Sequence, residues 1–245
     1  MPDTRHHRGP HPEDARLFVD SRLPSLRQAV SDLSLLLSRG YGEKSALKLV
    51  GDRYQLTSRQ RVAVLRSSCA DEALEGRCAR HQAVEQLRNA PLHVDGYNLL
   101  VCVESAMGGG VILVGRDGCL RDLASVHGTY RTVEETIPAV QLIGEVLAEL
   151  APGAVHWYFN APVSNSGRLK ELVSNLADDR GWCWTAQLVP DPDTVLISCN
   201  ETVVSSDSRI LDNCRVWVNL ASEVITRRIS TAWMLSLIPK NESHQ

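Results

Sequence analysis

The chain has 245 residues, of which 43% are hydrophobic and 22% are charged. These values are typical of a folded globular protein and exclude a mainly disordered, collagen-like or coiled-coil chain. The length is sufficient for one large domain or two small ones. The longest apolar runs, 99–103 and 111–114, are far shorter than the roughly 20 residues that span a bilayer. With a polar N-terminus that lacks an apolar signal core, these features predict a cytoplasmic protein without membrane contact.

The net charge of −3 hides an asymmetry between the two parts of the chain. Residues 1–90 hold 15 Lys and Arg against 11 Asp and Glu, whereas residues 91–245 hold 11 against 18. The split indicates either two separate tasks or simply two solvated surfaces of different sign. The seven cysteines form no Cys-x-x-Cys pair, so we interpret them as reduced thiols rather than as a disulfide framework or a zinc ribbon.

Residues 1–90 are predicted to form a small helical domain. Apolar residues recur at helical spacing between positions 26 and 50, and Pro24 suits the first turn of a helix. Residues 57–60 have the spacing of a capping box that starts a further helix, and Gly40 suits a helix end. Six cations lie close together in this part: Lys44, Lys48, Arg53, Arg59, Arg61 and Arg66. They could form a phosphate-binding face, in which Arg59 and Arg61 would contact a nucleic acid, or be ordinary surface charge.

Residues 91–245 are predicted to form an α/β domain. Helices are expected at 97–107, 133–150, 167–179 and 221–237, and short apolar runs, expected as strands, at 92–94, 111–114, 155–159, 185–189, 194–198, 203–205 and 216–218. Strands that alternate with helices of this length predict a mainly parallel central sheet in a three-layer α/β/α sandwich. Ligands of such folds bind at the carboxyl ends of the strands.

Carboxylates follow several of the predicted strands. Asp95 comes directly after the first, and Asp207 follows the run 203–205, with Asp212 five residues further on. If these strands are neighbours, the acids converge, and a Mg²⁺ or Mn²⁺ ion would offset their repulsion. Asp117 and Asp122, flanked by arginines, are further catalytic candidates, although an Asp-Gly turn with a local ion pair would explain Asp117 equally well.

The run 155–159 ends at Asn160, which is followed by small polar residues and a basic helix start. We expect this segment to hold a phosphate of the substrate through Ser164, Asn165, Ser166, Arg168 and Lys170. The alternative is an ordinary helix cap followed by basic residues. His127, Tyr130 and Arg131 are expected on the opposite side, where the aromatic ring would stack on a base and the cations would hold the backbone. Glu104 could face the site or solvent.

The sequence resembles the PIN-like superfamily of metal-dependent nucleases, in particular its NYN-type branch. Residues 94–100 resemble the first-strand motif of that branch, and residues 205–207 resemble the motif that carries its late acid. Residues 49–54 and 162–169 also resemble an uncharacterised two-domain family in which a helical domain precedes a PIN-like domain. The resemblance implies a phosphodiesterase in which Asp95, Asp207 and Asp212 bind Mg²⁺ or Mn²⁺, supported by Asn98, Ser206 and Asn160. It also implies self-association.

The leading hypothesis is therefore a divalent-metal-dependent ribonuclease whose helical domain assists RNA binding. The alternative is a catalytically inactive PIN-like module that binds RNA or a protein, because Asn160 stands where many relatives place Asp. A third hypothesis is a small-molecule phosphohydrolase that uses the same acids, in which case the basic helix would have no role.

Overall fold

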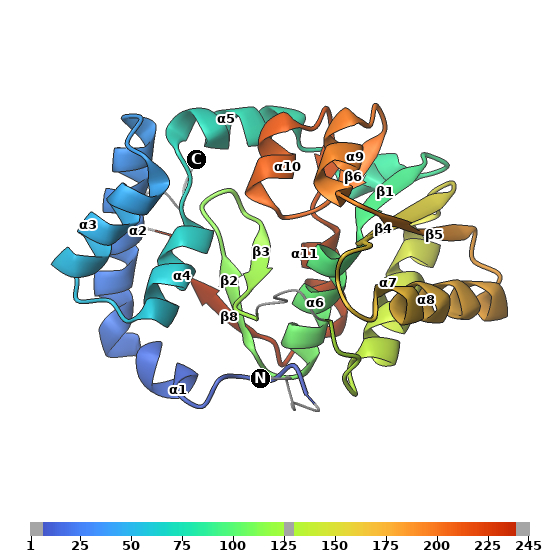
Figure 1. Cartoon of the computed structure of the whole chain (residues 1–245), viewed down its shortest axis with the longest axis horizontal. Helices are drawn as coiled ribbons and strands as arrows, with labels where there is room; N and C mark the ends of the chain where they lie inside the picture. Colours follow the sequence, from blue (N-terminus) through green and yellow to red (C-terminus); the bar gives the residue numbers. More distant parts are fainter. Residues whose placement is uncertain (1–6, 125–129, 239–245) are drawn as a thin grey trace.

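The computed structural model describes residues 7–124 and 130–238 and contains two β-sheets, both in contact with helices. Figure 1 shows the N-terminal helices on one side, the larger sheet with its helices on the other, and the smaller sheet between them. No helix within the described ranges is long and apolar enough to cross a bilayer.

The N-terminal part is helical, as predicted. Its elements are α1 (Asp14–Leu17), η1 (Asp20–Arg22), α2 (Leu23–Ser38), α3 (Glu43–Arg53), α4 (Ser58–Ser67), α5 (Asp71–Arg80) and η2 (Val84–Leu87). Pro24 lies in the first turn of α2, and Gly40, with φ of +76°, follows its end. The capping box before α4 is present, because Thr57 and Gln60 each accept a hydrogen bond from the other's backbone N–H.

The larger sheet has five strands, all parallel. The strands are β1 (Leu92–Asp95), β4 (Val155–Asn160), β5 (Trp184–Val189), β6 (Thr202–Val204) and β7 (Trp217–Val218), in the spatial order β5-β4-β1-β6-β7. The central strand β1 pairs with β4 on one side and with β6 on the other. The parallel sheet confirms the predicted fold class and brings the carboxyl ends of β1 and β6 side by side.

Helices cover both faces of this sheet. They are α6 (Gly96–Met107), α7 (Thr136–Leu150), α8 (Ser166–Arg180), α9 (Pro192–Ser198), α10 (Ser208–Asn213) and α11 (Leu220–Arg228). On one face, Val94 and Trp157 of the strands pack in a core with residues of α6, α7, α8 and α11. On the other face, Tyr158 and Val203 pack against α9 and α10. The result is the predicted three-layer α/β/α arrangement.

A second sheet, β3-β2-β8, connects the α/β part to the N-terminal helices. It consists of β2 (Val111–Val114), β3 (Leu120–Asp122) and β8 (Trp233–Ser236). Side chains of β2 and β8, including Leu113 and Leu235, share one core with residues of α2, α3 and α4. The sequence division at residue 90 therefore separates two regions that are joined through a common core.

Three predicted elements differ from the structure. The helix expected over 221–237 ends at Arg228, because residues 233–236 pair with β2 as strand β8. The apolar run 194–198 is not a strand but lies in α9, where Leu196 faces the core. Helix α7 begins at Thr136 rather than at 133, and the side chain of its N-cap residue, Glu135, makes no capping bond.

Candidate functional site

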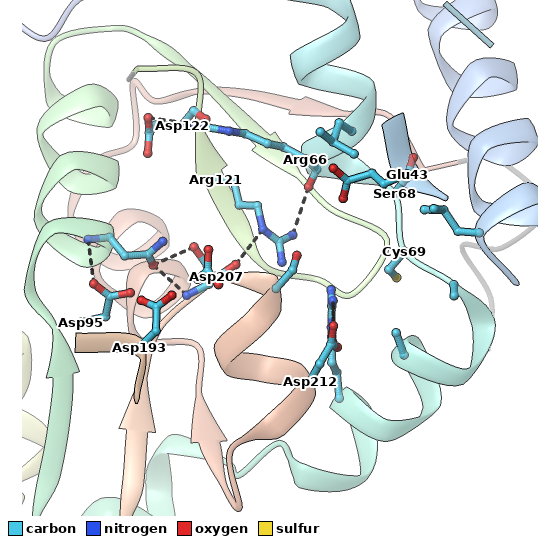
Figure 2. A pocket seen from close by; sticks show the side chains of 18 of the residues that line it. Glu43, Arg66, Ser68, Cys69, Asp95, Arg121, Asp122, Asp193, Asp207 and Asp212 are labelled. Atoms are coloured by element: carbon cyan, nitrogen blue, oxygen red, sulfur yellow. Dashed lines mark hydrogen bonds and ion pairs between the residues drawn. The ribbon is translucent and has the colours of Figure 1, made fainter. Parts of the chain in front are cut away.

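A pocket of about 590 Å³ opens at the carboxyl ends of β1 and β6. The α/β part lines it on one side, with residues such as Asp95, Asn98 and Asp207, and α4 and α5 line it on the other, with Arg66 and Arg77. Figure 2 shows Asp95, Asp193 and Asp207 grouped on one side of this pocket, and Asp212 further along it. The pocket thus lies between the two regions of the chain.

Asp95 is the last residue of β1 and the N-cap of α6. Its side chain is 8% exposed, accepts a hydrogen bond from the Ser205 hydroxyl at 2.9 Å, and caps the helix by accepting from the Asn98 N–H at 3.4 Å. In the described chain no Lys, Arg or His forms an ion pair with it. Burial, together with the negative charge of Asp207, raises the pKa of Asp95 to about 7.

Asp207 and Asp193 bring two more carboxylates to the same side of the pocket. Asp207 follows β6 and caps α10, where its Oδ1 accepts from the N–H groups of Arg209 and Ile210. Asp193 lies in the first turn of α9 and is paired with Arg209 at 3.1 Å. Burial and the nearby charge of Asp207 raise the pKa of Asp193 above its usual value. Asp207 was predicted from its place after a strand, whereas Asp193 was not predicted.

A small hydrogen-bond network fixes the turn between β6 and α10. The Asn98 amide oxygen accepts from the Ser206 N–H at 2.7 Å and from the Ser206 hydroxyl at 2.9 Å. The Arg121 guanidinium donates to the Ser206 carbonyl at 2.8 Å, and Ser205 bonds to Asp95 as described. Asn98 and Ser206 therefore lie beside the acids, as predicted for supporting residues, and Ser205 makes the direct contact that the sequence did not reveal.

Asp212 and Asp117 are held by Arg77. Asp212 lines the pocket, but its two oxygens accept from the Arg77 guanidinium at 2.7 and 2.9 Å. Asp117 does not line the pocket; its side chain is 1% exposed and is paired with both Arg77 and Arg121. Burial opposes ionisation of Asp117, yet the two guanidinium groups hold its pKa well below the usual range. Asp117 is therefore part of a buried ion-pair network outside the pocket, and Asp212 lies in the pocket with both carboxylate oxygens bonded to Arg77.

Asp122, the remaining predicted catalytic acid, lines the pocket at the end of β3. Burial raises the pKa of Asp122 above its usual value, although the neighbouring Arg66 opposes the shift. The Arg66 guanidinium lies 3.4 Å from an Asp122 carboxylate oxygen and donates to the Ala124 carbonyl at 3.3 Å. Arg66 is thus the cation of the predicted basic helix that reaches the pocket.

The other predicted substrate-binding cations of the helical part have structural partners. Arg59 forms an ion pair with the buried Asp14, with Nη2 and Oδ2 2.7 Å apart, and Arg61 pairs with Asp52 at 2.7 Å. Neither lines the pocket. Both arginines were predicted to bind substrate because they lie on the same basic helix as Arg66, and their ion-pair partners lie outside that helix.

The predicted phosphate-binding segment after β4 lies outside the pocket. None of its members lines the pocket; they are Asn160, Ser164, Asn165, Ser166, Arg168 and Lys170. Asn165 precedes α8 with φ of +69° and donates to the Tyr130 carbonyl at 2.9 Å instead of capping the helix with its side chain. Ser166 is buried, whereas Ser164, Asn165 and Arg168 are exposed.

The predicted base-stacking role of Tyr130 is wrong. Its side chain is fully buried, and its hydroxyl donates to Glu104. Glu104 faces neither the site nor solvent, because it is also fully buried and pairs with Arg8 at 3.0 Å. The Arg131 carbonyl accepts from Arg8 at 3.0 Å, and Arg131 does not line the pocket. His127 lies outside the described residues.

Carboxylate oxygens, the ligand type that hard divalent cations prefer, are numerous in the pocket. Six acids and three arginines line it, and each arginine is already paired with a carboxylate of the described chain. The oxygens of Asp95, Asp193 and Asp207 do not all lie within 4.8 Å of one another, since within the described ranges only another group of residues meets that spacing. Mg²⁺ keeps several of its waters and needs only one or two direct carboxylates, so this wider spacing is compatible with it.

Comparison with known proteins supplies the family. Residues 84–223 match the model described as a domain of unknown function (DUF5616), which covers more than half of the chain. The chain belongs to this family. Residues 25–80 match a second model, described as a protein of unknown function (DUF434). An uncharacterized protein of Methanocaldococcus jannaschii is 28% identical over 203 residues, which is 82% of this chain and 97% of the relative. No solved structure matches.

Proposed function

We propose that the pocket is the active site of a PIN-like, divalent-metal-dependent ribonuclease, and that the helical region helps to hold the RNA. The observation that carries the proposal is the convergence of Asp95, Asp193 and Asp207, which follow three different strands of one parallel sheet, in a single pocket. Ligands of parallel α/β folds bind at this edge of the sheet.

The charges of the pocket favour a metal-dependent reaction. With three more acids than arginines among its lining residues, the pocket repels a polyanion such as RNA until cations enter it. Mg²⁺ or Mn²⁺ would supply this charge and polarise a phosphoryl oxygen. In this proposal Asp95 and Asp207 hold the ion together with Asp193, which replaces Asp212 in the predicted set.

The remaining residues position these acids. The Ser205 hydroxyl holds one oxygen of Asp95, and the pair of Asn98 and Ser206 keeps the Asp207 turn close to β1. Arg66, one of the two arginines on the helical wall of the pocket, would contact a phosphate of the substrate. Because helices α4 and α5 form that wall, an RNA strand in the pocket would contact both regions of the chain.

The test is cleavage of a fluorescently labelled single-stranded RNA by the full chain in the presence of Mn²⁺. We expect product from the wild-type protein, none after addition of EDTA, and none from folded Asp95→Asn or Asp207→Asn protein, since amides keep the size of the side chain but remove its charge. The matched control is Asp52→Asn, an aspartate on α3 outside the pocket, which is expected to cleave at the wild-type rate.

The outcome also separates the proposal from its alternative. RNA binding without metal-dependent product, for RNAs of several sequences and structures, would overturn the nuclease proposal in favour of an inactive RNA-binding module. Product that survives both EDTA and the Asp95→Asn substitution would equally contradict it. Turnover of simple phosphomonoesters in preference to RNA would indicate the small-molecule phosphohydrolase.

A further inference from the structure

A second cluster of metal-binding residue types lies on the α9 face of the large sheet. His93, Cys199 and Glu201 each offer one ligand atom, and these atoms all lie within 4.8 Å of one another. The His93 Nε2 is 2.5 Å from a carboxylate oxygen of Glu201, and the Glu201 N–H donates to the Cys199 sulfur at 3.4 Å. Within residues 7–124 and 130–238 this is the only group of three such residues that meets this spacing.

The cluster is distinct from the carboxylate pocket in place and in chemistry. Helix α9 has Asp193 in its first turn and Cys199 as its C-cap, so the pocket and the cluster lie at opposite ends of this helix. His93 precedes Asp95 by two residues on β1, and Glu201 directly precedes β6. The pocket offers only oxygen ligands on its acidic side, whereas the cluster offers nitrogen, sulfur and oxygen.

We propose that His93, Cys199 and Glu201 bind a single Zn²⁺ ion. Imidazole nitrogen, thiolate sulfur and carboxylate oxygen are all common zinc ligands, whereas Mg²⁺ and Ca²⁺ select oxygen. On binding, the Cys199 thiol releases its proton to solvent, the metal replaces the hydrogen bond between His93 Nε2 and Glu201, and the imidazole proton moves to Nδ1. The three side chains leave the fourth position of a tetrahedral ion to water. Glu201 is 50% exposed and His93 is 12% exposed, so an ion reaches the cluster from solvent.

A neighbouring residue orients the imidazole for this role. The Nδ1 of His93 lies 3.0 Å from the Tyr158 hydroxyl, which is the kind of outer contact that fixes the tautomer of a metal-binding histidine. With Nε2 on the metal, Nδ1 carries the proton and donates it to the Tyr158 oxygen. The His156 ring lies close to that of His93 in a tilted arrangement, with ring centroids 4.9 Å apart, but its Nδ1 is hydrogen-bonded to Thr185 and it is not part of the cluster.

The test is titration of the purified, reduced, full-length chain with Co²⁺, which reports a thiolate ligand by a ligand-to-metal charge-transfer band in the near ultraviolet. We expect this band in the wild-type protein, its loss on addition of one equivalent of Zn²⁺, and its absence from Cys199→Ser protein that retains the wild-type circular dichroism. Two control variants are expected to keep the band: Cys183→Ser, which removes an exposed thiol outside the cluster, and His156→Ala.

Two further variants test the zinc proposal more specifically. Tyr158→Phe is expected to weaken Zn²⁺ binding roughly 10- to 100-fold, because it removes only the contact that orients His93. Asp95→Asn is expected to leave the cobalt band unchanged, so the zinc proposal is tested independently of the nuclease proposal. Absence of the band from the wild-type protein, or its persistence in Cys199→Ser, would overturn the zinc proposal.

Discussion

The buried ion-pair network around Asp117 leads to a quantitative prediction. Its carboxylate, 1% exposed, is shared by Arg77 and Arg121, which are 3% and 9% exposed. In Asp117→Asn, Arg77 keeps Asp212, but Arg121 loses the one carboxylate with which it pairs in the described chain. Breaking a buried pair by removing one partner costs about 3–5 kcal/mol, so we expect a loss of that size in the free energy of unfolding. This is a large share of the roughly 5–15 kcal/mol that stabilises a typical domain.

The assay is urea denaturation at pH 7, with Asp52→Asn as the matched control. Asp52 also has two cationic partners, Lys48 and Arg61, but its side chain is 51% exposed. Solvent screens this exposed network, so the control is expected to change stability by only a small fraction of the Asp117→Asn effect. Equal losses for the two variants would refute the reasoning from burial. A fully stable Asp117→Asn protein that had lost ribonuclease activity would instead return Asp117 to the catalytic role predicted from the sequence.

The same network predicts how stability depends on pH. Burial alone would raise the pKa of Asp117, but Arg121 and Arg77 hold it well below its usual range. An acid with a lowered native pKa contributes stability that is complete above its unfolded pKa of about 3.9 and is lost as the pH falls below it. The stability difference between wild type and Asp117→Asn is therefore expected to stay constant from about pH 5 to 8 and to shrink below about pH 4.

Three further predictions concern local packing and charge. Gly96→Ala would place a Cβ 2.3 Å from the buried Phe159 ring and is expected to cost about 1–3 kcal/mol by thermal unfolding, whereas Gly42→Ala, with nothing within 4 Å of the new Cβ, should cost far less. Thr57→Ala removes the capping box of α4 and is expected to cost about 1 kcal/mol in urea denaturation. Burial raises the pKa of Asp95 to about 7, so its ionisation destabilises the metal-free fold as the pH rises from about 4 through 7. In EDTA, Asp95→Asn should thus be more stable than wild type at pH 8 and lose this advantage towards pH 4; a variant less stable at pH 8 would contradict this.

Local sequence patterns correctly predicted those helices and strands whose formation depends on neighbouring residues in the sequence. Helical periodicity and end signals located α2, α4 and α6 closely, and the alternation of strands and helices predicted the parallel sheet. The pattern failed where pairing with distant residues decides the structure. Residues 233–236 continue an apolar pattern of helical spacing after α11, but they pair with β2 more than a hundred residues earlier in the chain. No local signal distinguishes these alternatives.

The candidate site shows the same division. Asp95 and Asp207 were predicted because an acid directly after a strand lies at the ligand-binding edge of a parallel sheet. Asp193 follows β5 by four residues and lies at the same edge of the sheet. Residues 194–198 were predicted to be a strand, so Asp193 was expected before a strand instead of after one. Arg59 and Tyr130 were predicted to bind substrate because a cation and an aromatic ring suit RNA. Their buried partners, Asp14 and Glu104, are distant in sequence, so no local signal indicated them.

The position of Asn160 bears on the choice between an enzyme and an inactive module. In the sequence, this amide was the reason for the alternative of an inactive module, because it stands where many members of the PIN-like superfamily that the chain resembles place a carboxylate. In the structure Asn160 does not line the pocket, whereas Asp193 enters it from α9, the helix that follows the adjacent strand β5. In the proposed metal site, Asp193 provides the carboxylate that Asn160 does not, so the amide by itself does not argue against that site. The decisive variant is Asp193→Asn: we expect it to abolish Mn²⁺-dependent cleavage, whereas Asn160→Ala should retain it.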